Sequence, residues 1–158
     1  MNISDFVGTT PEFRPETFLD GRLEGWGIME RLTGGLQQRF TVQAQGRFDG
    51  DALAFTETWT FDDGHVDTLN WRIRPLGDGG YIGEEDRLDG EADGDQSGCA
   101  FHWRYTRDVP QKDGSSTKLY FNDWFYRIDD QTVMVKGTAG RLGVPFATAH
   151  LLYRRLRD

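Results

Sequence analysis

A carboxylate lies in the middle of an aromatic segment. Residues Phe55–Phe61 read FTETWTF. In an extended strand the odd-numbered residues share one face, so Glu57 lies beside Phe55 and Trp59. A lone carboxylate among rings is costly to bury, so it pairs with a cation or changes its pKa. Glu57 is therefore the first candidate for chemistry. It orients the polar head of a ligand, acts as an acid or base, or forms a structural ion pair.

The next segment, Val66–Arg74, supplies further candidates. An Asp-Asp-Gly turn separates it from the first, and Asp-Gly between two alternating segments predicts a hairpin. Trp71 lies on the apolar face of this segment and Arg72 on the opposite face. We expect Trp71 to line the same site as Glu57, with Arg72 or Arg104 near the head group of a ligand.

A histidine interrupts a second aromatic segment, CAFHWRYTR. Trp103 and Tyr105 share one face of it and are expected to contact a ligand, while His102 lies on the other face with Arg104. Histidine titrates near neutral pH, so His102 is a candidate acid or base that would act together with Glu57.

The segment LYFNDWFYRI carries apolar side chains on both faces. Such a strand is covered on both sides, here by the N-terminal segment or by a partner chain. Asp123 within it is either a ligand contact or the ion-pair partner of Lys136 or Arg141. Trp124 lies on the opposite face and is a further expected ligand contact.

The remaining polar residues do not form a recognisable cofactor or metal motif. The three histidines have no metal-ligand spacing, and the acidic segment Gly83–Asp95 lacks the ligand order of a calcium loop. We interpret that segment as a solvated hairpin tip. No glycine-rich phosphate loop leads into a helix. Cys99 is the single cysteine, which excludes an intrachain disulfide. We expect no metal and no cofactor.

The charge and the hydropathy pattern exclude several classes of protein. The net charge of −8 disfavours binding to nucleic acid and to anionic membrane surfaces. The N-terminus has no basic start followed by an apolar core, so it does not resemble a signal peptide. No apolar stretch is long enough to span a membrane. Together with the single cysteine, these features predict a cytoplasmic protein.

From Arg22 onward, apolar and polar residues alternate between Gly- and Asp-rich breaks, which is typical of antiparallel strands. A short helix is expected only at Gly137–Phe146 or in the N-terminal lead-in. The expected strands are Arg22–Leu32, Leu36–Phe48, Ala52–Phe61, Val66–Arg74, Tyr81–Leu88, Gly98–Arg107, Thr117–Arg127, Thr132–Thr138 and Phe146–Arg155.

Long consecutive strands favour closure, because closure removes the unpaired edges of a sheet. We therefore predict an all-β fold: one antiparallel, lipocalin-like barrel of about eight to nine strands that holds one small ligand. Residues 1–158 form a single domain, with residues 1–17 as an extended lead-in. The expected lining is Phe55, Trp59, Leu69, Trp71, Phe101, Trp103, Tyr105 and part of Tyr120, Trp124 and Tyr126.

Several phrases together resemble a bacterial family of unknown function, family 3833 among such domains. The resemblance covers about Phe18 to Arg155. The phrases that carry it are FLDGRLEGWG, RFTVQAQGRFDGDALAFTETWTFDDG, LNWRIRP, YIGEEDRLDGEADGDQSGCAFHWRY, LYFNDWFYRIDD and VKGTAGRLGVPFATAHLLYRR.

The resemblance implies a lipocalin-like fold and tilts the expected ligand towards lipid, because relatives often lie beside genes for modifying fatty acids. Many members look like lipoproteins, whereas this chain has no lipid-modified N-terminal cysteine. It also has Asn122-Asp123-Trp124 where the family has a DDW-like phrase. The family has no established activity, so the resemblance informs the fold more than the function.

Three functions fit these observations. The leading one is binding of a hydrophobic small molecule, a fatty acid or another lipid, in bacterial lipid metabolism. The second is a cofactor-independent lipid-modifying enzyme, isomerase- or cyclase-like, that uses Glu57 and His102. The third is a homodimeric interaction module that pairs through the outer face of Tyr120–Tyr126.

Overall fold

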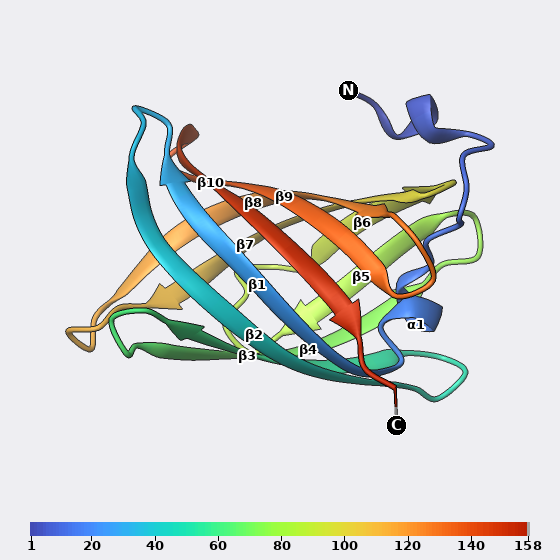
Figure 1. Cartoon of the computed structure of the whole chain (residues 1–158), viewed down its shortest axis with the longest axis horizontal. Coiled ribbons are helices and arrows are strands. Elements are labelled where there is room, and N and C mark those ends of the chain that lie inside the picture. The colour runs from blue at the N-terminus through green and yellow to red at the C-terminus, as the bar shows by residue number, and fades with distance from the viewer. Residues whose placement is uncertain (158) are drawn as a thin grey trace.

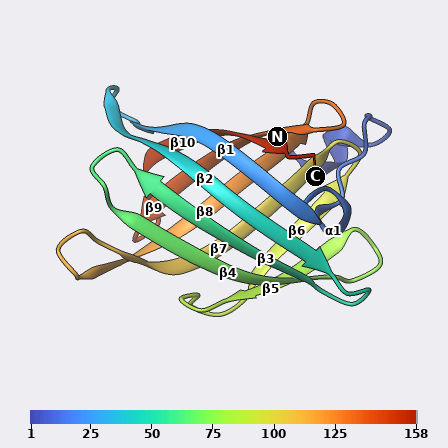
Figure 2. The same ribbon diagram turned by 60° about the horizontal axis from the view of Figure 1, so that its bottom comes forward.

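The computed structural model describes residues 1–157, and its strands form one closed barrel. Each strand pairs antiparallel with its neighbours in sequence, and β1 closes the barrel against β10 (Figures 1 and 2). The strands are β1 (Gly21–Arg31), β2 (Leu36–Phe48), β3 (Leu53–Phe61), β4 (Val66–Pro75), β5 (Gly80–Glu85), β6 (Ala92–Ser97), β7 (Ala100–Pro110), β8 (Ser116–Arg127), β9 (Thr132–Arg141) and β10 (Val144–Arg155).

The all-β antiparallel barrel is thus confirmed, with ten strands rather than eight or nine. The additional strand is β6, which lies in the acidic segment that we interpreted as a solvated hairpin tip. Its alternation is hidden because Ala92 and Gly94, which face inward, are small, while Asp93 lies exposed on the other face. A Cβ on Gly94 would lie 2.5 Å from the Trp103 ring, so the aromatic core requires glycine there.

Of the two places where a short helix was expected, the N-terminal lead-in contains one and Gly137–Phe146 does not. This segment forms the hairpin between β9 and β10, with Leu142 and Gly143 at positive φ in its turn. The side chains of neighbouring strands occupy the space that a Cβ would need at two of its glycines. A Cβ on Gly137 would lie 2.5 Å from Oδ1 of Asp123, and one on Gly140 would collide with the Tyr120 ring.

The N-terminal lead-in is not simply extended. It contains the 3₁₀ helix η1 (Ile3–Phe6) and the short helix α1 (Pro15–Phe18), and it runs along one end of the barrel (Figure 1). Phe13 and Phe18 are completely buried in the barrel core. Phe13 stacks on Phe125 at a centroid distance of 5.8 Å. The lead-in therefore closes this end of the barrel.

No helix among residues 1–157 is both long enough and apolar enough to cross a membrane.

The buried lead-in predicts a large loss of stability when Phe13 is truncated. Phe13→Ala should lower the free energy of unfolding by about 3–5 kcal/mol, because it removes a fully buried ring and leaves a cavity. The control Val7→Ala, at a residue that is 74% exposed, should change it by less than about 0.5 kcal/mol. Chemical denaturation measures both. Equal effects would show that the lead-in does not contribute to the core.

Candidate functional site

The barrel encloses a cavity of about 370 Å³. Its walls are mostly aromatic and aliphatic. Residues of the turns between β3 and β4 and between β7 and β8 line its mouth, at the end opposite the lead-in. The predicted residues Phe55, Trp59, Leu69, Trp71, Phe101, Trp103 and Tyr105 all line the cavity.

Glu57 points into this cavity from β3, as the alternation predicts. Glu57 is 7% exposed, and its carboxyl group accepts two hydrogen bonds. The indole N–H of Trp71 donates to Oε2 at 3.1 Å, and the hydroxyl of Tyr153 donates to Oε1. These donors come from β4 and β10, so the barrel fixes the carboxyl from both sides.

Burial raises the pKa of Glu57, because a low-dielectric site disfavours the charged form. The donors Tyr153 and Trp71 and the nearby N–H of Trp59 oppose this shift, as does the charge of Arg107. The Trp59 N–H nevertheless does not reach hydrogen-bond geometry with Glu57. It is buried without a partner among the described residues.

Asp123 points into the same cavity from β8, where Gly137 on the adjacent strand leaves room for its carboxyl group. The Tyr105 hydroxyl donates a weak hydrogen bond of 3.4 Å to Oδ2. Burial, followed by the charge of Glu57, raises the pKa of Asp123 to about 7. The cavity therefore contains a carboxyl group that exchanges its proton near neutral pH.

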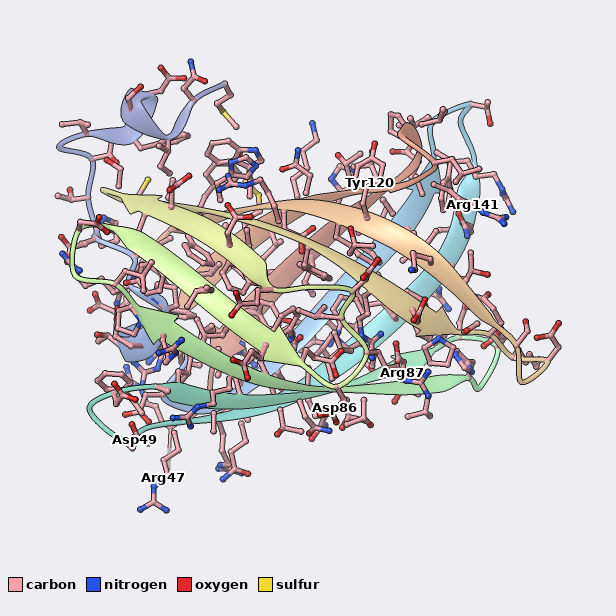
Figure 3. All side chains as sticks on the ribbon, turned by 180° about the vertical axis from the view of Figure 1, so that it is seen from behind. Arg47, Asp49, Asp86, Arg87, Tyr120 and Arg141 are labelled. Atoms are coloured by element: carbon pink, nitrogen blue, oxygen red, sulfur yellow. The ribbon has the colours of Figure 1, made fainter. Side chains whose placement is uncertain are left out.

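Asp123 does not pair with Lys136 or Arg141. Lys136 lies on the exposed face of β9, and Arg141 lies at the exposed end of that strand. Figure 3 shows Arg141 at the outer surface, away from the barrel interior.

A buried ionic cluster, which sequence analysis missed, borders the cavity. Arg107 is 2% exposed, and its guanidinium donates to Asp67 at 2.7 and 3.2 Å and to Glu85 at 2.6 Å. Arg107 continues the inward period of Trp103 and Tyr105. This two-residue period could have indicated that Arg107 faces inward, although a charged residue at the end of a strand is more often exposed to solvent.

Three predicted site residues lie outside the barrel. Arg72 is exposed and forms an ion pair with Asp51 at 3.6 Å. His102 stacks on Trp124 at a centroid distance of 4.0 Å, and its Nε2 meets the side chain of Asn122. The prediction of His102 as an acid or base acting with Glu57 is wrong, because the barrel wall separates them. Arg72 and Trp124 are excluded from the cavity for the same reason.

Arg104 also lies outside, and it cannot neutralise a ligand head group in the cavity. Its guanidinium donates to Asp93 at 2.6 Å, to Asp95 at 3.0 Å and to Nδ1 of His102 at 2.6 Å. Partial burial lowers the pKa of His102. The group is thus a hydrogen-bonded cluster on the outer wall.

The outer aromatic face of β8 does not line the interior, so the expected contribution of Tyr120, Trp124 and Tyr126 is wrong. Trp124 and Tyr126 pack against Phe6 of η1, at centroid distances of 5.8 and 5.6 Å. The N-terminal segment therefore covers part of this face, which was one of the two expected covers. Figure 3 shows Tyr120 at the outer surface.

Within residues 1–157, no group of three or more His, Cys, Asp or Glu side chains is arranged to hold a metal ion.

A family model described as "Protein of unknown function (DUF3833)" matches residues 1–155. The chain belongs to this family. No curated protein matches it. Its fold is similar to that of the S-type phycobiliprotein lyase CPES from Guillardia theta, with a TM-score of 0.61. The two share 8% sequence identity, and the match covers 88% of this chain and 89% of the other. At this identity the similarity concerns the fold alone.

The raised pKa of Asp123 predicts a pH-dependent stability. Between its unfolded pKa of 3.8 and its folded pKa of about 7, the folded state binds more protons, so stability falls as the pH rises through this window. Asp123→Asn removes this titration. Relative to the wild type, the variant should gain on the order of 2 kcal/mol between pH 5 and pH 8. Denaturant unfolding at both values measures the gain.

The exposed Asp51→Asn variant is the control for that measurement, because its carboxyl lies in a surface turn. It should follow the wild type at both pH values. If the Asp123→Asn variant also ran parallel to the wild type, Asp123 would titrate in the folded protein as it does in the unfolded chain.

The buried cluster predicts a strong dependence on Arg107. Arg107→Met leaves Asp67 and Glu85 buried without a counter-ion and should cost about 3–5 kcal/mol at pH 7. Arg72→Met removes a solvent-exposed ion pair and should cost less than about 1 kcal/mol. Denaturation at pH 7 compares the two. Similar losses would argue against a dominant role for the buried cluster.

Proposed function

We propose that this protein binds a small hydrophobic molecule of the lipid class inside its barrel. The observation that carries the proposal is the cavity of about 370 Å³, with apolar walls and a few fixed polar groups. Ligand sites have this composition, with polar groups that orient the molecule. Protein interiors are otherwise packed with few voids larger than water, so a space of this size at the barrel centre supports a binding role.

The mouth of the cavity supports entry of an apolar molecule. The turns between β1 and β2 and between β9 and β10 lie side by side, joined by a hydrogen bond of 3.1 Å from the N–H of Leu32 to the carbonyl of Phe146. Exposed apolar side chains gather on these two hairpins: Leu32, Leu36, Leu142, Val144 and Phe146. An apolar rim lowers the barrier for a hydrophobic molecule that leaves water.

An ionised fatty acid fits this interior poorly. Glu57 and Asp123 line the cavity, and the charge of Arg107 is already shared between Asp67 and Glu85. An additional carboxylate would meet like charges, and the part of the chain that the structure describes offers it no free buried cation. We therefore propose a lipid whose polar end is not an anion, or a fatty acid bound in its protonated form.

A second candidate is proton-transfer catalysis on the bound molecule. It is favoured by the pKa of Asp123 near 7, which allows the carboxyl to accept and return a proton at neutral pH. Glu57 lies in the same cavity and would hold the substrate. A lipid that emerges chemically changed from the wild type but unchanged from Asp123→Asn would favour catalysis over binding alone.

Filling the cavity should abolish binding without damaging the barrel. Ala149 lines the cavity, close to Gly137, so Ala149→Phe places a ring in the binding space. We expect native mass spectrometry with a bacterial lipid extract to show a lipid adduct on the wild type and none on this variant. Met134→Phe on the exposed face of β9 is the control and should retain the adduct.

Two results would contradict the proposal. An adduct that persists in Ala149→Phe would place the lipid outside the barrel. Absence of any adduct on the wild type across the extract would remove the binding function altogether.

A further inference from the structure

Carboxyl groups outnumber cationic groups in and around the cavity. Five carboxyl groups lie in or beside it, those of Glu57, Asp63, Asp67, Glu85 and Asp123. Arg107 is the one buried cation among residues 1–157. Arg107 is fully engaged with two of them. Lys112 lies at the mouth, where it donates to the backbone of Asp63 at 3.4 Å. The interior therefore presents an excess of hydrogen-bond acceptors to anything that enters.

Glu57 and Asp123 differ in how far the protein satisfies them. Both oxygens of Glu57 accept a hydrogen bond, from Tyr153 and from Trp71. Among residues 1–157, Asp123 accepts one weak side-chain bond, from Tyr105 to Oδ2, and its Oδ1 accepts none. Asp123 is partly buried, so this oxygen faces the open space of the cavity rather than packed protein. Asp123 thus has a free acceptor on the cavity wall.

A second observation also indicates an incomplete site. The indole N–H of Trp59 is buried in the cavity wall and has no hydrogen-bond acceptor among the described residues. A buried donor without a partner is rare in folded proteins. The free Asp123 oxygen in the same cavity needs a donor, whereas the Trp59 N–H needs an acceptor. A protonated amine supplies the donor alone, so the choice of an amine rests on Asp123.

We propose that the ligand is a hydrophobic molecule with a nitrogen hydrogen-bond donor, best a protonated amine, and that this group binds Asp123. The proposal rests on the binding function proposed above and names the ligand's polar end. An ammonium group supplies the cation and the donor that Asp123 lacks, through a charge-assisted hydrogen bond. An alcohol supplies a donor without charge, and a carboxylate supplies neither.

Other titratable groups face Asp123 and determine how its binding depends on pH. Tyr105 comes from β7, Glu57 from β3 and Tyr153 from β10. Gly137 on the adjacent strand β9 and Ala149 on β10 carry no charge. Burial raises the pKa of both tyrosines well above 10, so they stay neutral. Amine binding should therefore weaken as the pH falls below about 7, by up to about tenfold per pH unit.

The test compares three probes with the same chain: dodecylamine, dodecanol and dodecanoate, each titrated by calorimetry at pH 8. We expect dodecylamine to bind the wild type at least about tenfold more tightly than dodecanol, with dodecanoate weakest. Asp123→Asn should reduce the affinity for dodecylamine by about tenfold or more and leave that for dodecanol unchanged. Asp51→Asn should leave all three unchanged.

The net charge of −8 also attracts dodecylamine to the surface, so binding to the Ala149→Phe variant measures that contribution and is subtracted. Dodecanoate binding as tightly as dodecylamine at pH 8 would overturn the inference while the binding function stands. Equal dodecylamine affinity in the wild type and Asp123→Asn would do the same. Failure of all three probes to bind in the cavity would instead count against the proposed function itself.

Discussion

The closed barrel imposes a strict separation of two surfaces, on which every other feature of the site depends. Because β1 pairs with β10, there is no free edge, and each strand sends alternate side chains inward or outward. Glu57, Asp123 and Arg107 share the inner surface. Their neighbours in sequence lie on the outer surface, where solvent and surface ion pairs satisfy them. A shift of one residue in the register of a strand would move a charged side chain from the cavity to the outer surface.

This constraint has an energetic consequence for the carboxyl groups inside. Each of them loses hydration when the barrel closes, and the charged form is disfavoured unless donors or cations replace the water. The protein meets this cost in two ways. Around Asp67 and Glu85 it supplies an arginine with hydrogen bonds as short as 2.6 Å. Around Glu57 it supplies neutral donors, which hold the carboxyl in place but leave its pKa raised.

The two-residue alternation and the Asp-Gly turns were sufficient to predict the barrel and the inward position of Glu57. The same alternation, applied to CAFHWRYTR, already placed His102 opposite Trp103. The expectation that His102 acts together with Glu57 came from the chemistry of the two side chains. It is wrong because they lie on opposite faces of the barrel wall. The alternation predicted that Asp123 shares the face of Phe121 and Phe125. It could not predict that Asp123 has no cationic partner, because ion pairs across a barrel depend on which strands become neighbours.

Strand β6 and the N-terminal lead-in are the two places where the apolar–polar pattern of the sequence did not predict which residues are buried. In β6 the inward positions are Ala92 and Gly94, which carry no hydrophobic signal because the rings of β7 fill that space. In the lead-in, Phe13 and Phe18 follow no regular period, because the segment packs across the end of the barrel rather than along a strand. In both places the burial of a residue is decided by a partner distant in sequence.

The two buried polar clusters therefore differ in kind. The cluster of Arg107, Asp67 and Glu85 is complete, since each charge has an opposite charge within 2.7 Å. Removing Arg107 leaves two buried carboxylates unpaired, and removing either carboxylate unlinks one strand, so the cluster holds β4, β5 and β7 together. The cluster of Glu57, Asp123 and Trp59 is incomplete. One carboxyl oxygen of Asp123 and the indole N–H of Trp59 have no partner within residues 1–157 and face an apolar space. A folded chain gains stability by satisfying such groups internally. Keeping them unsatisfied around a space of this size is physically consistent with a site whose last partner is the ligand.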